Sequence, residues 1–171
     1  MSVAGEASKR EIAARTCVVI PAFNEAEVIG SVVDGLVTRG FEVVVVDDAS
    51  TDATTERATS GGAVAIRHLI NRGQGAALET GILRALQSGA DFVVTFDADG
   101  QHDPDDVFRL VEPLLDGKYD VALGSRFLAS RNTVPVARRL LLRAAVVFTR
   151  AASGIAVTDT HNGLRAFSAR A

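Results

Sequence analysis

Short apolar runs alternate along this chain with longer segments that show helical periodicity. The clearest apolar runs lie at residues 17–20, 41–46 and 92–96, and they predict three strands. Weaker runs at residues 64–69 and 119–123 predict two more. The run at 41–46 is almost continuously apolar and β-branched, which is typical of a parallel strand covered on both faces.

Each predicted strand except the last is followed by a segment with the features of a helix. These helices are expected to begin near residues 24 and 50 and to span residues 74–88 and 104–115. The first has the spacing of a capping-box variant, with Asn24 as N-cap and Glu27 three residues later. Strand and helix in alternation predict an α/β fold, with a mostly parallel sheet flanked by helices.

The length of the chain and the composition of its N-terminal segment indicate how it is divided into domains. A chain of 171 residues suits one domain, expected from residue 16 to 171, with residues 1–15 as a polar, flexible leader. No apolar run approaches the roughly 20 residues of a membrane-spanning helix, and the N-terminus lacks a signal pattern. The single cysteine, Cys17, cannot form an internal disulfide, and its place in an apolar run predicts a buried, inert thiol.

Polar side chains gather where the predicted strands end. In parallel sheets, ligands bind beyond the carboxyl ends of the strands, so these side chains are expected to converge on one crevice. The clusters are residues 21–25, 47–48, 97–99 and 124–126.

The most informative cluster is Asp97-Ala98-Asp99, which follows a buried strand directly. Two carboxylates one residue apart offer oxygen ligands to a hard divalent cation, which in turn can neutralise a diphosphate. The alternative is a solvated acidic loop, because short motifs of this kind often occur without function.

Charge is distributed unevenly along the chain. Residues 1–120 carry 20 acids and 10 Lys or Arg, whereas residues 121–171 carry one acid and eight Arg. A basic helix is expected over residues 135–153, and it suits either an anionic membrane surface or a helix with a solvated Arg face. Nucleic acid is not expected as a partner, because the first 120 residues are acidic and basic and aromatic residues are not interleaved.

Six segments together resemble the inverting family 2 glycosyltransferases of GT-A (Rossmann-like) fold. Within that family the chain is most similar to the dolichol-phosphate mannosyltransferase type and the bacterial polyprenyl-phosphate sugar transferases. The resemblance covers residues 16–168. It rests on residues 21–25, 46–52, 71–75, 97–104, 124–127 and 159–165.

The resemblance implies a role for individual residues. A divalent cation, Mg²⁺ or Mn²⁺, would be held by Asp99 and Gln101, with Asp97 beside the metal and the ribose. Asp48 would contact the base or ribose. The implied catalytic residues are Asp99, Arg126 and Asp159. The implied substrate-binding residues are Pro21, Phe23, Glu25, Asp48, Arg72, Asp97, Ala98, Gln101, Arg126 and Arg165.

The implied activity is metal-dependent, inverting transfer of a sugar from a GDP- or UDP-sugar to an acceptor, which the resemblance suggests is a polyprenyl or other lipid phosphate. Residues 16–126 would form the nucleotide-binding part and residues 127–171 an acceptor-side basic segment. Similar enzymes continue past this point, so the domain is expected to be truncated at its C-terminus. A role in the cell envelope is implied, in the cytoplasm or peripherally on the inner face of the cell membrane.

Two alternatives remain open on the sequence. The chain could bind a nucleotide-sugar without turnover. It could also be a haloacid-dehalogenase-like phosphatase, in which Asp97 would be the nucleophile. Individual residues have plainer interpretations too: Glu25 could only cap a helix, and Asp47 and Asp48 could lie in a solvated turn. The three histidines are too scattered for a zinc site.

Overall fold

The computed structural model describes residues 3–124 and 163–171. Residues 1–122 together with 164–171 form one compact unit, which holds almost all the elements described below. The basic helix predicted over 135–153 lies outside the described residues, as do Arg126 and Asp159.

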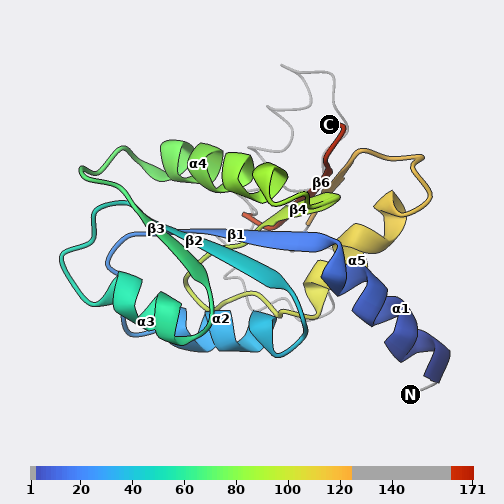
Figure 1. Cartoon of the computed structure of the whole chain (residues 1–171), viewed down its shortest axis with the longest axis horizontal. Coiled ribbons are helices and arrows are strands. Elements are labelled where there is room, and N and C mark those ends of the chain that lie inside the picture. The colour runs from blue at the N-terminus through green and yellow to red at the C-terminus, as the bar shows by residue number, and fades with distance from the viewer. Residues whose placement is uncertain (1–2, 125–162) are drawn as a thin grey trace, which may run out of the picture. The chain divides into compact units, whose positions relative to one another are not determined.

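A six-stranded sheet forms the centre of this unit (Figure 1), and its strand order is β3-β2-β1-β4-β6-β5. Strands β1 to β4 pair in parallel, whereas β6 is antiparallel to β4. The predicted fold class, a mostly parallel sheet flanked by helices, is therefore confirmed. The strands are β1 Thr16–Ala22, β2 Glu42–Asp47, β3 Val64–Arg67, β4 Phe92–Thr95, β5 Val121–Leu123 and β6 Arg165–Ser168.

Helices cover both faces of the sheet. One face packs on α4, and the other packs on α2 and α3, as Figure 1 shows. Side chains alternate along each strand between these two cores: in β1, Val19 faces the α4 side, whereas Val18 and Ile20 face the α2 side. The helices are α1 Val3–Ala14, α2 Ile29–Val37, α3 Thr54–Ser60, α4 Gln74–Gln87 and α5 Asp106–Val111, followed by the 3₁₀ turn η1 Glu112–Leu114.

Helix α4 lies unusually close to the sheet at Gly81, which is buried. A Cβ atom added there would lie 2.3 Å from Cγ1 of Val19 and 3.1 Å from Cγ2 of Val46. Glycine is therefore required for the backbone of α4 to approach β1 and β2 this closely.

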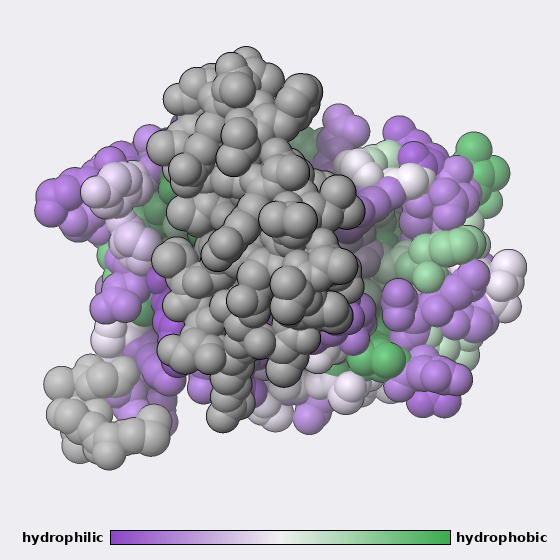
Figure 2. Space-filling model, turned by 180° about the vertical axis from the view of Figure 1, so that it is seen from behind, coloured by the Kyte–Doolittle hydropathy of each residue, from purple (hydrophilic) through white to green (hydrophobic). Residues whose placement is uncertain are grey.

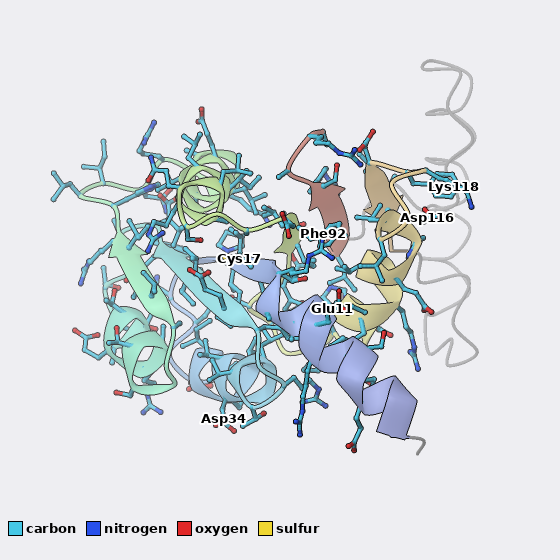
Figure 3. All side chains as sticks on the ribbon, turned by 45° about the vertical axis from the view of Figure 1, so that its right-hand side comes forward. Glu11, Cys17, Asp34, Phe92, Asp116 and Lys118 are labelled. Carbon is cyan, nitrogen blue, oxygen red and sulfur yellow. The ribbon has the colours of Figure 1, made fainter. Side chains whose placement is uncertain are left out.

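The thiol of Cys17 lies in the same core and is completely buried (Figure 3). Burial, reinforced by the negative charge of Glu42 and partly offset by Arg84, raises the pKa of this thiol to about 12. Since the thiolate is the reactive form, Cys17 is inert at neutral pH, as its sequence context predicts.

The N-terminal segment differs from the flexible leader expected over residues 1–15, because residues 3–14 form helix α1. The helix is ordered at its C-terminal end, where Ile12 and Ala13 are buried in the main core. The ammonium group of Lys9 also lies 4.9 Å from the centre of the Phe108 ring, a cation–π contact with α5.

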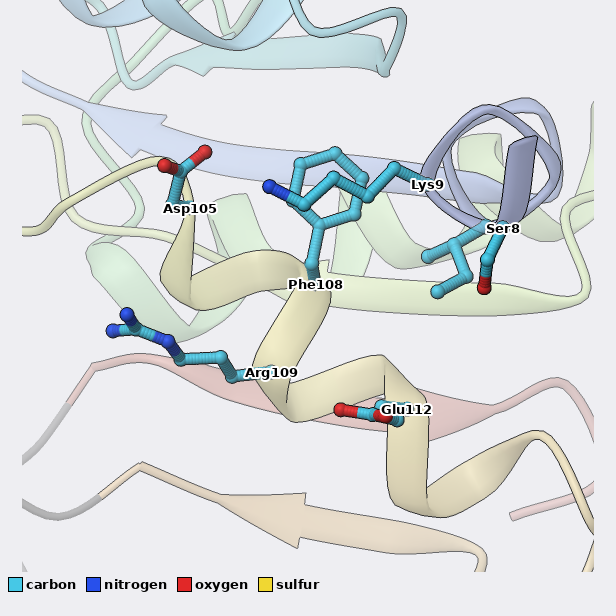
Figure 4. A pocket seen from close by; sticks show the side chains of 7 residues that line it. Ser8, Lys9, Asp105, Phe108, Arg109 and Glu112 are labelled. Carbon is cyan, nitrogen blue, oxygen red and sulfur yellow. The ribbon is translucent and has the colours of Figure 1, made fainter. Parts of the chain in front are cut away.

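The helix predicted over 104–115 is interrupted. The α-helical part ends at Val111 and continues as the 3₁₀ turn that contains Pro113. Proline has no N–H to donate to the carbonyl four residues earlier, so the α-helix cannot continue through it. A pocket of about 280 Å³ lies between α1 and α5 and is lined largely by charged side chains (Figure 4).

Strand β6 was not predicted from the sequence. It is four residues long and enters the sheet between β4 and β5. Figure 2 shows the molecule from behind the view of Figure 1. The described residues visible there are mostly hydrophilic, with scattered hydrophobic residues. None of the helices in the described ranges is long and apolar enough to cross a membrane.

Candidate functional site

The carboxyl ends of the four parallel strands lie along one edge of the sheet. Their register pairs Ala22 of β1 with Asp47 of β2, and Asp47 with Arg67 of β3. On the other side of β1, Val19 pairs with Thr95, the last residue of β4. The loops that follow these strands carry the residues singled out in the sequence.

The loop after β1 is held by the loop after β2. Asn24 has a left-handed backbone conformation, with φ of 57°, and its side-chain oxygen accepts a hydrogen bond of 2.9 Å from the N–H of Thr51. In return, the N–H of Asn24 donates to Oγ of Ser50 over 2.9 Å. Helix α2 begins only at Ile29 and has no side-chain cap, so the predicted capping box is wrong. Asn24 serves the contact between the two loops.

Two further residues extend this contact. The N–H of Glu25 donates to Oγ1 of Thr54 over 2.9 Å, and the N–H of Ala26 donates to Oδ2 of Asp52 over 3.1 Å. The hydroxyl of Thr54 donates to Asp52 and lowers the pKa of that carboxyl below its usual value. The backbone of the predicted nucleotide-pocket segment, residues 21–25, is thus fixed by side chains of residues 50–54.

Asp47 and Asp48 are both buried, which excludes the interpretation as a solvated turn. Asp47 accepts hydrogen bonds from the N–H of Ser50, over 2.8 Å, and from the hydroxyl of Thr55. Asp47 therefore connects the loop after β2 to the first turn of α3.

Asp48 connects the end of β2 to the loop after β3. Its Oδ1 accepts the N–H of Arg72 at 2.9 Å, and its Oδ2 accepts the N–H of Gly73 at 2.6 Å. Nδ1 of His68 lies 2.7 Å from Oδ1. Burial raises the pKa of this carboxyl, but the hydrogen bonds from Arg72, His68 and Gly73 outweigh burial and hold the pKa below its usual value.

Both oxygens of Asp48 are thus engaged by the protein itself, a role that sequence reasoning missed, as it missed His68. No sequence signal pointed to His68, because the predicted strand covered residues 64–69, whereas β3 ends at Arg67. Contact of Asp48 with a base or ribose stays a prediction.

The side chains expected to bind nucleotide differ in exposure. Phe23 is 47% exposed and Arg72 is exposed, so both are accessible to a ligand. Pro21 is only partly exposed, and it lies in β1 beside Val46.

Asp97 and Asp99 directly follow β4. Asp97 is half-buried, and its Oδ2 lies 3.1 Å from Nε2 of His102, whose ring packs edge-on against Phe96. Asp99 is exposed, and its Oδ1 accepts the N–H of Gln101 over 3.0 Å, so the carboxylate closes a tight turn.

The turn between these carboxylates is closely packed. Ala98, which separates Asp97 from Asp99 in the sequence, is buried. Gly100 has a φ of 71°, and a Cβ atom there would lie 2.9 Å from a methyl carbon of Val28. Both the backbone conformation and the close approach of Val28 therefore favour glycine at this position.

The donor set of this turn fits a hard cation. Carboxylates of Asp97 and Asp99 and the carboxamide of Gln101 supply only oxygen ligands of the kind that Mg²⁺ and Mn²⁺ prefer. Within residues 3–124 and 163–171, no three His, Cys, Asp or Glu side chains are grouped closely enough to hold a metal alone. Mg²⁺ is usually bound through one or two carboxylates together with substrate phosphates.

Arg165 lies at the same end of the sheet. It begins β6, is exposed, and pairs with Thr95, two residues before Asp97. The antiparallel strand therefore brings a residue from the C-terminal part of the chain to the carboxyl end of β4.

The strand-end loops and the Asp97–Asp99 turn lie on one edge of the sheet. The family to which the whole chain is similar indicates what such a site binds. The chain matches Glycosyl transferase family 2 over residues 17–170. It belongs to this family. Membership speaks against the phosphatase alternative for Asp97.

Two relatives are similar to most of this chain. The chain is 44% identical to an uncharacterized protein of Methanocaldococcus jannaschii, over 88% of this chain and 63% of that protein. It is 33% identical to a UDP-N-acetylglucosamine–dolichyl-phosphate N-acetylglucosaminyltransferase of Methanococcus voltae, over 88% of this chain and 68% of that protein. The chain thus spans about two thirds of the length of these relatives.

A solved structure is similar as well. It is the glucosyl-3-phosphoglycerate synthase of Mycobacterium tuberculosis in complex with Mn²⁺, UDP-glucose and phosphoglyceric acid. The TM-score is 0.66 at 32% identity, over 96% of this chain and 60% of that chain.

Proposed function

We propose that this chain is a metal-dependent, inverting glycosyltransferase that moves a sugar from a UDP- or GDP-sugar to a polyprenyl phosphate. The observation that carries the proposal is the Asp97–Asp99 turn, which lies at the carboxyl end of β4 beside the connected loops of β1 and β2. Membership of glycosyltransferase family 2 supports it. Residues 16–126 would form the donor part and residues 127–171 the acceptor side.

The chemistry of sugar transfer suits this turn. Cleavage of the bond between sugar and diphosphate builds negative charge on the leaving group. A bound Mg²⁺ or Mn²⁺ would stabilise that charge where it develops. Asp99 and Gln101 would hold the cation, and Asp97, oriented by His102, would lie beside it. The similar solved structure contains Mn²⁺ together with UDP-glucose, which supports use of a divalent cation.

The acceptor is proposed to be a lipid phosphate, because the Methanococcus voltae relative is named for transfer to dolichyl phosphate. A phosphate that is already ionised needs little help from a general base, whereas an alcohol acceptor would need one. Arginine side chains suit phosphate capture, and Arg165, which is exposed and pairs with the last residue of β4, would contact the acceptor phosphate. Arg126 and Asp159 are proposed to act on the same side. The chain would then work peripherally on the inner face of the cell membrane.

Nucleotide binding with and without metal tests the donor half of the proposal. We expect UDP or GDP to bind in calorimetry with Mg²⁺ or Mn²⁺ and to lose affinity at least tenfold in EDTA. Asp99→Ala should remove the metal-dependent part. Asp34→Ala is the matched control, because Asp34 is an exposed carboxylate on α2 (Figure 3). Binding that neither EDTA nor Asp99→Ala weakens would contradict a metal clamp at this turn.

The acceptor is tested separately. Sugar from a labelled UDP- or GDP-sugar should be transferred to vesicles that contain a polyprenyl phosphate and not to vesicles that contain the corresponding polyprenol. Equal transfer to both would show that the phosphate is not recognised.

A further inference from the structure

His68 is a buried ionisable side chain for which the proposed chemistry has no direct use. It follows β3, is 8% exposed, and its N–H donates to the carbonyl oxygen of Asp47 over 2.9 Å. Its ring joins two elements. Nδ1 lies 2.7 Å from Oδ1 of Asp48, and Nε2 lies 3.0 Å from Oγ1 of Thr80 in α4.

One partner of this ring fixes the position of a ring proton. The Asp48 carboxylate can only accept, so Nδ1 carries a proton. The hydroxyl of Thr80, which also lies 2.9 Å from the carbonyl oxygen of Ala76, is within hydrogen-bond distance of Nε2. His68 is therefore a hydrogen-bond donor to Asp48, and its ring links the end of β2 to α4.

The Asp48 side chain of this pair holds the loop that leads into α4. Oxygens of Asp48 accept the N–H groups of Arg72 and Gly73 at 2.9 and 2.6 Å. Gly73 has a φ of 88°, a conformation that favours glycine. The guanidinium group of Arg72 is exposed and forms no ion pair with any residue in the described ranges. The backbone of Arg72 is fixed, while its side chain stays available to a ligand.

The strand order indicates which part of a donor would reach this loop. Strands β3 and β4 are separated by β2 and β1, and adjacent strands lie about 4.8 Å apart, so their ends are about 14 Å apart. If the diphosphate lies at Asp97–Asp99, then an extended nucleoside diphosphate runs along the sheet edge toward β2 and β3. The loop after β3 would meet its nucleoside end.

We propose that His68 is a positioning residue for the nucleoside of the donor: through Asp48 it fixes the loop 71–73 so that Arg72 contacts the base or ribose. This inference rests on the proposed donor-binding function. Because His68 acts through Arg72, its effect should depend on that arginine and should not extend to the diphosphate.

A double-mutant cycle tests the mechanism. The ligands are UDP or GDP, whichever the wild type binds more tightly, and inorganic pyrophosphate, each with Mg²⁺. We expect His68→Ala and Arg72→Gln each to weaken nucleotide binding about tenfold, as for loss of one hydrogen bond to a charged group. The double variant should bind no more weakly than either single variant, and pyrophosphate affinity should stay within about twofold. His68→Asn keeps a donor toward Asp48 and should recover part of the loss.

A purely structural role predicts different results. Equal losses for nucleotide and pyrophosphate, or additive losses in the double variant, would overturn the proposal. Arg72→Gln changes only an exposed side chain, so it keeps the test decisive even if His68→Ala does not fold. Unchanged nucleotide affinity in Arg72→Gln would overturn this inference alone, whereas a wild type that binds neither ligand would overturn the proposed function and this inference with it.

Discussion

The backbone N–H of Gly73 donates to Oδ2 of Asp48 over 2.6 Å, so a carboxylate at the end of β2 fixes the loop that follows β3. Asp48→Asn would leave one acceptor oxygen for two backbone amides and would remove the negative partner of His68. We expect this substitution to lower the free energy of unfolding by about 3 kcal/mol at neutral pH, because each hydrogen bond to a charged group contributes about 1.5 to 3 kcal/mol.

The same substitution should change the dependence of stability on pH. The pKa of the Asp48 carboxyl is lower in the folded protein than the ordinary value of 3.8. Its contribution is therefore complete above pH 3.8 and is lost as the pH falls from there through the folded pKa. Urea titrations between pH 2 and 7 should show a smaller loss on acidification in Asp48→Asn than in the wild type.

Asp116→Asn is the control for this measurement. Asp116 also has a lowered pKa, because it accepts hydrogen bonds from Lys118, but both side chains are exposed (Figure 3). This variant should not change stability measurably at neutral pH. An acid-unfolding curve of Asp48→Asn that is parallel to the wild-type curve would show that the hydrogen bonds to Asp48 do not stabilise the fold.

The strands and helices that the sequence predicts well are those with strong local patterns. The apolar run at 41–46 and the helical spacing over 74–88 correspond to β2 and α4 within about one residue at each end. Strand β6 escaped prediction because four residues carry too little periodicity, and its place in the sheet is set by pairing with the distant β4. Helix α1 was missed because, among its described side chains, only Ile12 and Ala13 are buried.

The candidate site divides in the same way. The position of Asp97 and Asp99 at a strand end could be read from the strand that precedes them. The roles of Asn24, Asp48 and His68 could not, because each depends on a hydrogen bond to a residue 20 or more positions away. Sequence spacing carries no information on such contacts until the strand order is known.

Packing between α4 and the sheet gives a second prediction. Gly81→Ala places a methyl group against Val19 at a distance that no packed structure tolerates, so α4 must move outward. We expect a loss of about 2 kcal/mol or more, as in other overpacked cores. Gly75→Ala is the matched control, because it is in the same helix and a Cβ atom there meets nothing within 4 Å. It should be neutral or more stable by up to about 1 kcal/mol, and thermal unfolding of both variants measures the difference. Equal melting temperatures would show that α4 does not need its close approach.

The contact between the loops after β1 and β2 gives a third prediction, which separates backbone strain from hydrogen bonding. Asn24 and Ala49 both have positive φ, of 57° and 65°. Only Asn24 uses its side chain, which accepts the N–H of Thr51. Asn24→Ala should therefore cost about 2 kcal/mol, since it loses the hydrogen bond and is less suited than Asn to this conformation. Asn24→Gly accepts the conformation without strain but still loses the hydrogen bond, so it should cost less than Asn24→Ala, about 1 kcal/mol.

Ala49 isolates the contribution of the backbone. Relief of its left-handed conformation is worth about 1 to 2 kcal/mol, whereas the greater freedom of glycine in the unfolded chain costs about 0.5 to 1 kcal/mol. Ala49→Gly should therefore be about 0.5 kcal/mol more stable than the wild type in urea unfolding. If nucleotide binding depends on the order of the β1 loop, then Asn24→Ala should weaken binding of UDP or GDP with Mg²⁺, and Ala49→Gly should not. The opposite ranking would show that the hydrogen bonds between the loops do not shape the nucleotide pocket.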